Sequence, residues 1–291
     1  MKLHDVPRQL RTACEPRKTG PEMATVITPS AGNAPGLSDM WEQRELLYYL
    51  VLRDVSVRYK QTSLGLAWAF LQPLLPAIVF TVFFGKLANL PSDGMPYALF
   101  SYAGLLPWTF FSSSVSQASL SLVNSTSLFT KVYFPRVFIP LASIVTAGFD
   151  AIVSSVVLVG LMLYYHTPLS ANIVFLPLVV AIAAAFTIGS GTFLSASAIR
   201  YRDVRYIIPF MIQMLLFLCP VAYPASIVPE KWRLVWALNP MVAAVEGFRW
   251  SVLGTPLDVR TMGVGAVGAA VVLVAGVKYF QKVESTFADI A

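Results

Sequence analysis

Charged side chains are scarce in this sequence, whereas apolar runs are frequent. Only 12% of the 291 residues are Asp, Glu, Lys or Arg, and 56% are hydrophobic. An average soluble domain contains about 25% charged residues. This shortage of charge excludes an ordinary soluble domain and predicts an all-α polytopic membrane protein.

Residues that bind metals or act as nucleophiles are also few. The cysteines, Cys14 and Cys219, lie in an N-terminal tail and an apolar run, so neither a disulfide framework nor a metal site is predicted. The histidines, His4 and His166, are far apart in the sequence. HExxH and GxSxG motifs are absent, as are the paired aspartates of a metal-dependent glycosyltransferase. We therefore expect no catalytic residue and no metal or cofactor bound by this chain.

A phosphate-binding loop is missing as well. The segment FFGKLA at 83–88 contains Gly-Lys, but it lacks the upstream Gly and the following Ser or Thr of GxxxxGK[ST]. The chain itself is therefore not expected to hydrolyse ATP. Its net charge of +6 does not predict a nucleic-acid partner, because the basic residues lie mainly between apolar segments.

Six segments qualify as membrane spans, for which about 20 apolar residues are needed. They are 64–84, 97–123, 137–165, 173–199, 207–223 and 263–280, of which the last two are short. An even number of spans places both termini on one side of the membrane. With that side cytoplasmic, 16 of the 21 Lys and Arg residues lie inside and five lie outside. The positive-inside rule therefore predicts cytoplasmic termini.

The regions flanking these spans complete the predicted organisation. Residues 1–40 are rich in Pro, Thr and charge and lack the apolar core of a signal peptide, which predicts a disordered cytoplasmic tail. An interfacial helix at 41–62 follows. The six-span domain covers 63–282 and includes gate helices at 224–254, and a short cytoplasmic tail covers 283–291.

The segment 41–60 is predicted to form a helix that lies flat on the membrane. One stripe of this helix carries Trp41, Tyr48, Leu52, Val55 and Tyr59, and its charged residues lie away from that stripe. Ser63 can cap the next helix, and Gly65 permits a sharp turn into it. Leu46, Leu50 and Val57 lie on the other face, so a soluble helix packed on a partner is the alternative.

Residues 220–254 are too apolar for a solvated loop, yet prolines at 224, 229 and 240 divide them into pieces too short to cross a membrane. Two half-length helices, at about 229–238 and 240–253, are predicted to enter from the outside and return. Asn239 and Pro240 are the N-cap and first-turn residues of a helix start. Glu246 and Arg249 are three residues apart and can pair. An amphipathic hairpin on the outer surface is the alternative.

Asp150 is the one clear ionisable residue inside a predicted span, at a depth of about 20 Å. A structural hydrogen bond to Ser or Thr of a neighbouring helix and a role in transport both stay open. A proton-coupled carrier is not favoured, because we find neither a proton relay nor an internal repeat.

Aromatic residues make up 13% of the chain. Most are expected to form interfacial belts or to pack between helices, and the alternative is that some present their faces to sugar rings in a pore. Two loops, SLFTKVYFPR at 127–136 and RYRDVRY at 200–206, combine aromatic and basic residues. These loops are either positive-inside anchors or a docking surface for another protein.

Three stretches carry a resemblance to a known family. They are RYKQTSLGLAWAFLQPLL at 58–75, YRDVRYIIPFMIQMLLFLCPVAYP at 201–224 and LNPMVAAVEGFRWSVLG at 238–254. In this order they resemble the signatures of ABC-2 type membrane subunits that export polysaccharides, and the likeness extends over about residues 41–282. O-antigen exporters are the most similar group, and capsule and teichoic acid exporters are their close relatives.

The resemblance implies a homodimeric permease in the bacterial inner membrane, paired with two separate ATPase subunits that bind ATP and Mg²⁺. The dimer would enclose a channel for a lipid-linked polysaccharide. The implied sites are lipid head-group entry at Arg58, Lys60, Ser63, Leu64 and Gly65; the channel wall at Phe80 and Phe84; the outer gate at Asn239, Pro240, Glu246 and Arg249; and ATPase coupling at Phe129, Lys131, Tyr133, Phe134 and Arg136.

Other functions stay open from the sequence. A capsule or teichoic acid exporter would share the mechanism and differ in substrate. An ABC-2 lipid or drug exporter is a further alternative, against which the many aromatic residues argue weakly. A membrane-embedded glycosyltransferase or acyltransferase would need an acid/base residue, for which Asp150 is the available candidate.

Overall fold

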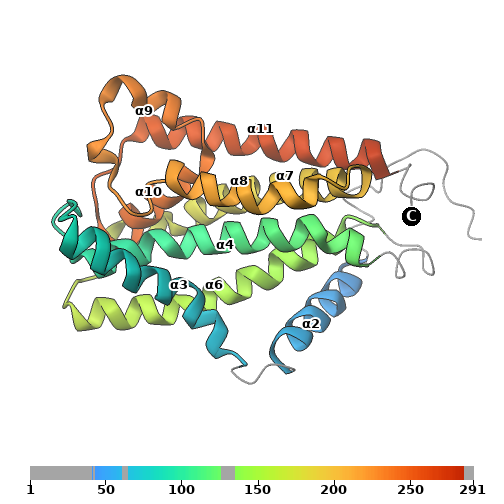
Figure 1. The fold of residues 1–291 in the computed structure, drawn as a ribbon, viewed down its shortest axis with the longest axis horizontal. Helices are drawn as coiled ribbons and strands as arrows, with labels where there is room; N and C mark the ends of the chain where they lie inside the picture. The colour runs from blue at the N-terminus through green and yellow to red at the C-terminus, as the bar shows by residue number, and fades with distance from the viewer. Residues whose placement is uncertain (1–40, 42, 61–64, 126–134, 285–291) are drawn as a thin grey trace, which may run out of the picture. The chain divides into compact units, whose positions relative to one another are not determined.

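The computed structural model describes residues 41, 43–60, 65–125 and 135–284. Contacts divide the chain into two units, residues 1–36 and 37–291, and all described residues belong to the second unit. Within that part every regular element is a helix, as predicted (Figure 1). The tail predicted at 1–40 and most of the loop at 127–136 lie outside the described residues.

The helices follow one another through short connections. In chain order they are α2 (Arg44–Lys60), α3 (Ala67–Phe80) with its π-helical extension η3 (Thr81–Leu87), α4 (Tyr97–Asn124), α6 (Phe138–Tyr164), the 3-10 turn η4 (Ala171–Phe175), α7 (Leu176–Arg200), α8 (Val204–Leu218), the 3-10 turn η5 (Ala225–Ile227), α9 (Glu230–Trp236), α10 (Pro240–Leu253) and α11 (Val259–Glu284).

Four helical stretches of the described chain are long and apolar enough to cross a membrane. They are Ala67–Leu87, Phe138–Tyr164, Ala171–Arg200 and Val259–Glu284. Each corresponds to one of the six predicted spans. The remaining two predictions fall on α4 and α8, which do not meet both criteria, so the six-span count stays a prediction.

The fifth predicted span was drawn too long. It was expected to reach residue 223, but α8 ends at Leu218, and Cys219 is already extended, with ψ at 147°. Pro220 explains this end, because a proline disfavours helical backbone at the residue before it. The last span was drawn too short, since α11 extends over Val259–Glu284 and includes charged residues at both ends.

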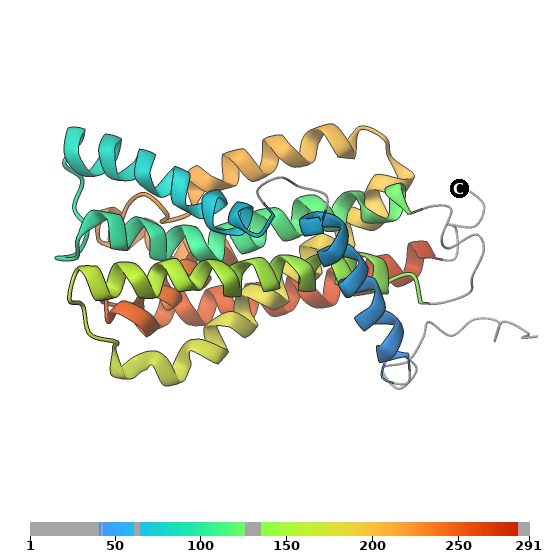
Figure 2. The ribbon, with the colours of Figure 1, turned by 90° about the horizontal axis from the view of Figure 1, so that it is seen from below.

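Helix α4 lies in the centre of the bundle, in contact with α3, α6, α7, α8 and α10 (Figures 1 and 2). Its side chains are largely buried, among them Leu99, Tyr102, Phe111 and Leu122. It also buries Ser114, Ser119 and Ser121. A helix enclosed by other helices does not need the hydropathy of one that faces lipid, which explains why α4 falls outside the candidate spans.

Helices α7 and α11 approach each other closely. Gly189 and Gly276 face one another there, and a Cβ added to Gly276 would overlap the Gly189 backbone. Small residues at such crossings let backbones approach within van der Waals contact, which replaces the hydrophobic driving force that lipid does not supply.

Helix α2 packs against α6 through Leu50, which meets Phe138 and Ala142 in a small apolar cluster. Trp41 and Tyr48 of the predicted stripe are exposed. The other face of the predicted helix, with Leu46 and Leu50, is therefore the side that packs on the bundle. Its residue Val57 is an exception, since it is exposed.

Candidate functional site

Two groups that include charged side chains join helices of the described bundle, one beside α2 and one beside α10. The first, called here the inner cluster, consists of Arg58, Tyr59, Gln117 and Asp150. Arg58 forms an ion pair with Asp150 and donates a hydrogen bond to Gln117. Tyr59 donates its hydroxyl to the other Asp150 oxygen. The inner cluster thus joins the end of α2 to the middle of α4 and α6.

The inner cluster settles what Asp150 contacts. Of the two possibilities left open for Asp150, a hydrogen bond from Ser or Thr to its carboxylate is not observed among the described residues, because its two oxygens accept from Arg58 and Tyr59. Burial, and then the hydrogen bond to Asp150, raises the pKa of Tyr59 above its ordinary value of 10.0. The phenol therefore stays protonated and remains a donor. An Asp150 held in this way fits a positioning role better than that of a catalytic acid or base.

A second set of hydrogen bonds lies one turn away from Asp150. Pro73, inside α3, has no N–H to donate to the carbonyl of Ala69. The hydroxyl of Ser154 lies 2.6 Å from that carbonyl oxygen and 2.8 Å from the Asp150 carbonyl of its own helix, so its proton can replace the missing donor at the nearer of the two acceptors. Tyr102 in turn donates to the Ser154 carbonyl at 2.9 Å. Helix α3 consequently continues through Gln72-Pro73 without a break.

At the other end of the bundle, α10 begins and ends as the sequence predicted. The Asn239 side chain accepts the Met241 N–H at 3.1 Å, and Pro240 occupies the first turn. Gly254 ends the helix in the left-handed region, with φ at 75°. The two predicted half-helices correspond to α9 and α10, although α9 covers only Glu230–Trp236.

Arg249 of α10 is the centre of the second polar group. Its guanidinium donates to the carbonyls of Phe100 at 3.1 Å, Pro220 at 2.5 Å and Val221 at 2.6 Å. It also pairs with Glu246 at 3.3 Å, which confirms the predicted pair. The guanidinium carbon stands 3.6 Å from the Phe100 ring centre. Arg249 therefore ties the segment after α8 to the start of α4.

Gly104 provides the room for this arginine. A Cβ at residue 104 would overlap the Arg249 guanidinium. Arg249 itself is 1% exposed, and a buried charge is tolerated only with its hydrogen bonds satisfied. This end of the bundle thus depends on a glycine, a buried arginine and three backbone carbonyls meeting in one place.

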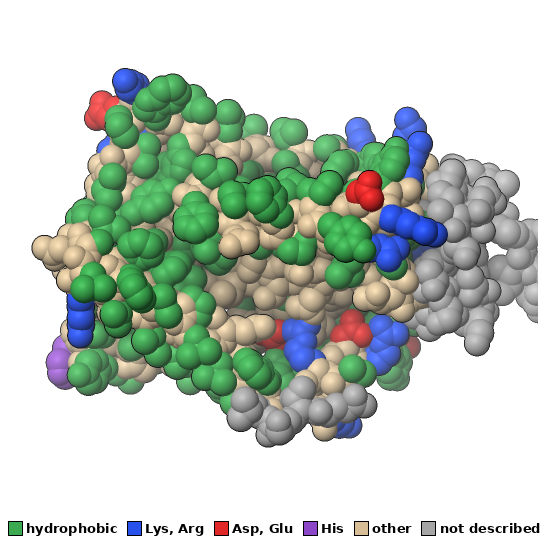
Figure 3. Space-filling view, viewed as in Figure 1, with side chains coloured by type: hydrophobic (Ala, Val, Ile, Leu, Met, Phe, Trp, Pro, Cys, Tyr) green, Lys and Arg blue, Asp and Glu red, His purple; other side chains and the backbone are tan. Residues whose placement is uncertain are grey.

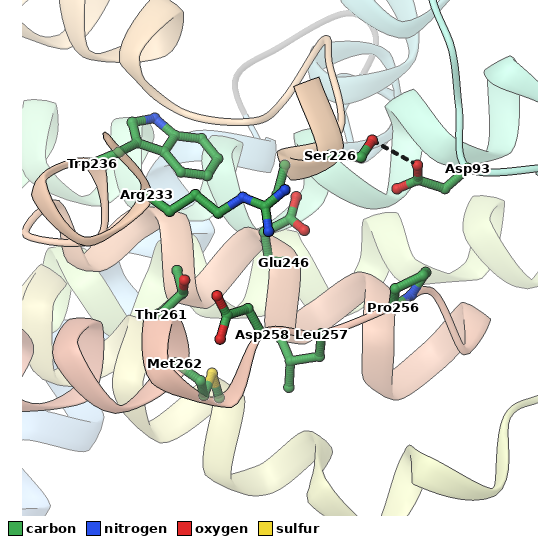
Figure 4. A pocket seen from close by; sticks show the side chains of 12 residues that line it. Asp93, Ser226, Arg233, Trp236, Glu246, Pro256, Leu257, Asp258, Thr261 and Met262 are labelled. Atoms are coloured by element: carbon green, nitrogen blue, oxygen red, sulfur yellow. Dashed lines mark hydrogen bonds between the residues drawn. The ribbon is translucent and has the colours of Figure 1, made fainter. Parts of the chain in front are cut away.

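Beside this arginine lies a cavity of about 240 Å³, shown in Figure 4 and called here the outer cavity. Its walls come from η5, α9, α10 and the start of α11, with Asp93 from the loop before α4. Glu246, Arg233 and Asp258 direct charged groups toward it (Figure 4). Of these three, only Glu246 was singled out from the sequence.

The other predicted site residues are placed as follows. Phe80 and Phe84 pack edge to face, with ring centres 5.4 Å apart, and Phe80 also packs on the main apolar core. Lys60 is exposed, and Gly65 has φ at 49°. Arg136 donates its backbone N–H to the Glu284 side chain at 3.2 Å. Ser63, Leu64, Phe129, Lys131, Tyr133 and Phe134 lie outside the described residues.

Several residues of these sites were missed by sequence reasoning. Gln117 and Ser154 are polar residues in helices, and their polarity was a signal that could have been followed. Asp93, Arg233 and Asp258 gave no such signal, because charged residues are common in loops such as those before α4 and α11 and in short helices such as α9. Their importance depends on which helix ends meet.

The surface of the bundle agrees with placement in a membrane. Figure 3 shows a broad apolar surface, with charged side chains gathered mainly toward the ends and along α2. The exposed apolar residues include Ile152 and Val156 of α6, Phe210 of α8 and Val267 of α11. Lipid can cover such residues, and water cannot do so without cost.

Comparison with known proteins gives the family. A model of the ABC-2 type transporter family matches residues 45–253. The O-antigen export system permease protein RfbA of Myxococcus xanthus is 30% identical over 213 residues, or 72% of this chain and 81% of that protein. RfbA of Klebsiella pneumoniae is 26% identical over 247 residues, or 84% and 95% of the two chains. The polysialic acid transport protein KpsM of Escherichia coli is 22% identical over 219 residues, or 72% and 82%. The chain belongs to the ABC-2 type transporter family.

Proposed function

We propose that this chain is the transmembrane subunit of an ATP-driven exporter that moves a lipid-linked, O-antigen-like polysaccharide across the bacterial inner membrane. The observation that carries the proposal is the family match over residues 45–253, together with relatives named for O-antigen and polysialic acid transport. A capsule polysaccharide is the second candidate substrate, because one relative is named a capsule polysaccharide export inner-membrane protein.

Energy for export comes from partner subunits. The chain lacks a GxxxxGK[ST] motif, so two separate ATPases bind ATP and Mg²⁺ and drive the cycle. Both chain termini are cytoplasmic, as the distribution of Lys and Arg favours. The loop that contains Phe129 and Tyr133 contacts the ATPase, and movement of the ATPases is passed to the permease there.

The channel forms between two copies of the chain, each with six spans. Helices α3 and α8 lie along the same side of α4 (Figure 2), and both expose large apolar side chains, among them Phe83, Phe210 and Phe217. A second copy placed against this side encloses a path with aromatic walls. Phe80 and Phe84 lie on α3 and η3, at the same side of the bundle.

The substrate enters where α2 meets the membrane. Lys60 is exposed at the end of α2, close in sequence to Arg58 and Gly65, and cations at this depth bind the phosphates of a lipid head group. The lipid-linked end passes first and the sugar chain follows. Helices α9 and α10 close the outer end as re-entrant gate helices until the polysaccharide passes.

The proposal is tested by export and by copurification. Deleting the gene should remove polysaccharide from the cell surface and let its lipid-linked form accumulate inside, and a plasmid copy should restore export. The chain extracted in mild detergent should carry a P-loop ATPase in equal amount. Changing Phe129→Ala and Tyr133→Ala together should release the ATPase, whereas Tyr164→Ala, an exposed aromatic on α6, should not. Normal surface polysaccharide in the deletion strain contradicts the proposal.

A further inference from the structure

The outer cavity has a feature that the export path does not require, namely an arginine without a carboxylate partner. The Arg233 Nε–H donates to the Val228 carbonyl at 3.0 Å, which fixes the direction of the side chain. Its guanidinium points into the cavity (Figure 4). Among residues 41, 43–60, 65–125 and 135–284, no carboxylate oxygen lies within 4.0 Å of it.

Carboxylates lie around this arginine, and each already has a partner in the protein. One Asp93 oxygen accepts the Ser226 hydroxyl at 2.9 Å. One Asp258 oxygen accepts the Arg260 N–H at 2.9 Å. Glu246 is bound to Arg249 at 3.3 Å. The second oxygens of Asp93 and Asp258 have no hydrogen-bond partner among the described residues.

The cavity therefore presents fixed donors and fixed acceptors that are too far apart to bind each other directly. Hydroxyl groups both donate and accept, so a polyhydroxylated ring can satisfy the two kinds of group together. An anion is disfavoured by the surrounding carboxylates. A metal ion is disfavoured because no described group of three His, Cys, Asp or Glu side chains is close enough to hold one.

The size of the outer cavity and the residues that line it also favour a sugar ring. Drug-sized ligands occupy cavities of about 300–1,000 Å³, and the outer cavity, at about 240 Å³, suits a ligand of about one sugar ring. The lining also offers apolar surface from Trp236 and Met262 for the C–H faces of such a ring. A few fixed polar groups on an otherwise apolar wall are typical of specific small-ligand sites.

We propose that the outer cavity binds one neutral sugar ring of the polysaccharide as it leaves the channel. This inference rests on the proposed export function and adds to it a binding site on the outer side. A ring in this site would contact Arg233 of α9 and Glu246 of α10 at once. A bound ring would therefore contact both gate helices, and it would compete with Arg249 for the carboxylate of Glu246.

The test measures binding to the intact exporter. The chain and its ATPase are placed in nanodiscs, and the probe is the exporting strain's own surface polysaccharide, cleaved by mild acid to short neutral oligosaccharides. Saturation-transfer NMR should show contact to ring protons. Arg233→Gln and Asp258→Asn should each weaken binding about tenfold, the usual scale for losing a hydrogen bond to a charged group. Asn at residue 258 can still accept the Arg260 N–H, so the start of α11 is preserved.

Two controls separate the site from general damage. Lys231→Gln makes the same charge change on α9, but Lys231 does not line the cavity, so binding should stay as in the wild type. Ala225→Phe fills the cavity without changing charge and should abolish binding while the ATPase still copurifies. Inorganic phosphate, used as a second probe, should not compete with the oligosaccharide.

The outcomes distinguish this inference from the proposed function. Wild-type binding by Arg233→Gln, Asp258→Asn and Ala225→Phe in a chain that restores export would overturn the sugar site and leave the exporter intact. Competition by phosphate would also overturn it and identify an anion site. Failure of the wild-type gene to restore surface polysaccharide would instead reject the export function.

Discussion

Pro73 of α3 leaves a backbone carbonyl without its helical donor, and a side chain of the neighbouring helix α6 supplies one. Without an N–H at residue 73, the carbonyl of the buried Ala69 loses its partner within α3. Ser154 on α6 supplies a donor at 2.6 Å. The helix α3 therefore continues past the proline, and the hydrogen bond from Ser154 joins it to α6.

This contact gives a prediction at the scale of one residue. Ser154→Ala should lower stability by about 1 kcal/mol, because a buried carbonyl loses its donor and such bonds in membranes are worth about that much. The measurement is a thermal or denaturant unfolding curve of the purified chain in detergent. The control is Ser155→Ala, whose hydroxyl donates at 2.6 Å within its own helix and is exposed. Equal losses in the two variants would refute the bridging role.

Arg249 is a second case at the scale of one residue, in which a charged side chain and not a hydroxyl supplies the donors. It is a buried charge that donates to the carbonyls of Pro220 and Val221, which follow α8, and to the carbonyl of Phe100 near the start of α4. Such a group adds little net stability compared with an apolar core, but removing its partners is costly. Its value lies in fixing one arrangement of the outer helices.

At the scale of an element, α2 is held by two different kinds of contact. Its N-terminal half packs on α6 through the apolar cluster around Leu50, and its C-terminal end is held by Arg58 and Tyr59 bound to Asp150. Tyr48 of this helix and Trp41 before it are exposed, as the predicted interfacial position requires. A helix attached in this way can turn or shift if its polar end is released.

The attachment can be tested through the exchange of backbone amides. Asp150→Asn removes the ion pair to Arg58, so the amides of 44–60 should exchange about tenfold faster, while those of α4 stay protected. The measurement is hydrogen exchange read by mass spectrometry on the chain in nanodiscs. Asp54→Asn is the matched control, because Asp54 pairs at 2.8 Å with an exposed Arg53 and surface pairs contribute little. Unchanged exchange in Asp150→Asn would show that the apolar cluster alone holds α2.

At the scale of the whole molecule, α8 presents a row of large apolar side chains that no other described helix covers. Phe210, Met214 and Phe217 follow one another on α8 at helical spacing, and all three are exposed. Lipid or a second copy can cover this side. The proposed channel requires the second copy.

Cysteine crosslinking distinguishes the two coverings. In a chain with Cys14 and Cys219 replaced, single cysteines at residues 210, 214 and 217 should give a covalent dimer with a short bifunctional linker at one or more positions. Cysteines at residues 267, 271 and 274 form the control, because Val267, Val271 and Val274 are exposed at the same spacing on α11. Crosslinks from α11 and none from α8 would place the dimer contact elsewhere.

Much of the fold could be read from the sequence because its signals are local. Long apolar runs predicted the positions of the helices, and Asn239-Pro240 predicted the start of α10. Errors occurred at helix ends, as at residues 219–223, where Pro220 rather than hydropathy decides the boundary. The count of spans could not be read in the same way, since the central helix α4 faces protein instead of lipid.

The sequence by itself determined the membrane class, the helical segments and contacts within one turn, such as the Glu246–Arg249 pair three residues apart. Those features follow from hydropathy and from the 3.6-residue period of a helix. Only the tertiary structure decided that Arg58 would meet Asp150 across 92 residues, that Gly104 would admit Arg249, and that Arg233 would face the outer cavity. Contacts of this kind depend on the angles and positions at which helices cross. These are decided by packing between residues far apart in the sequence, which a local sequence pattern does not show.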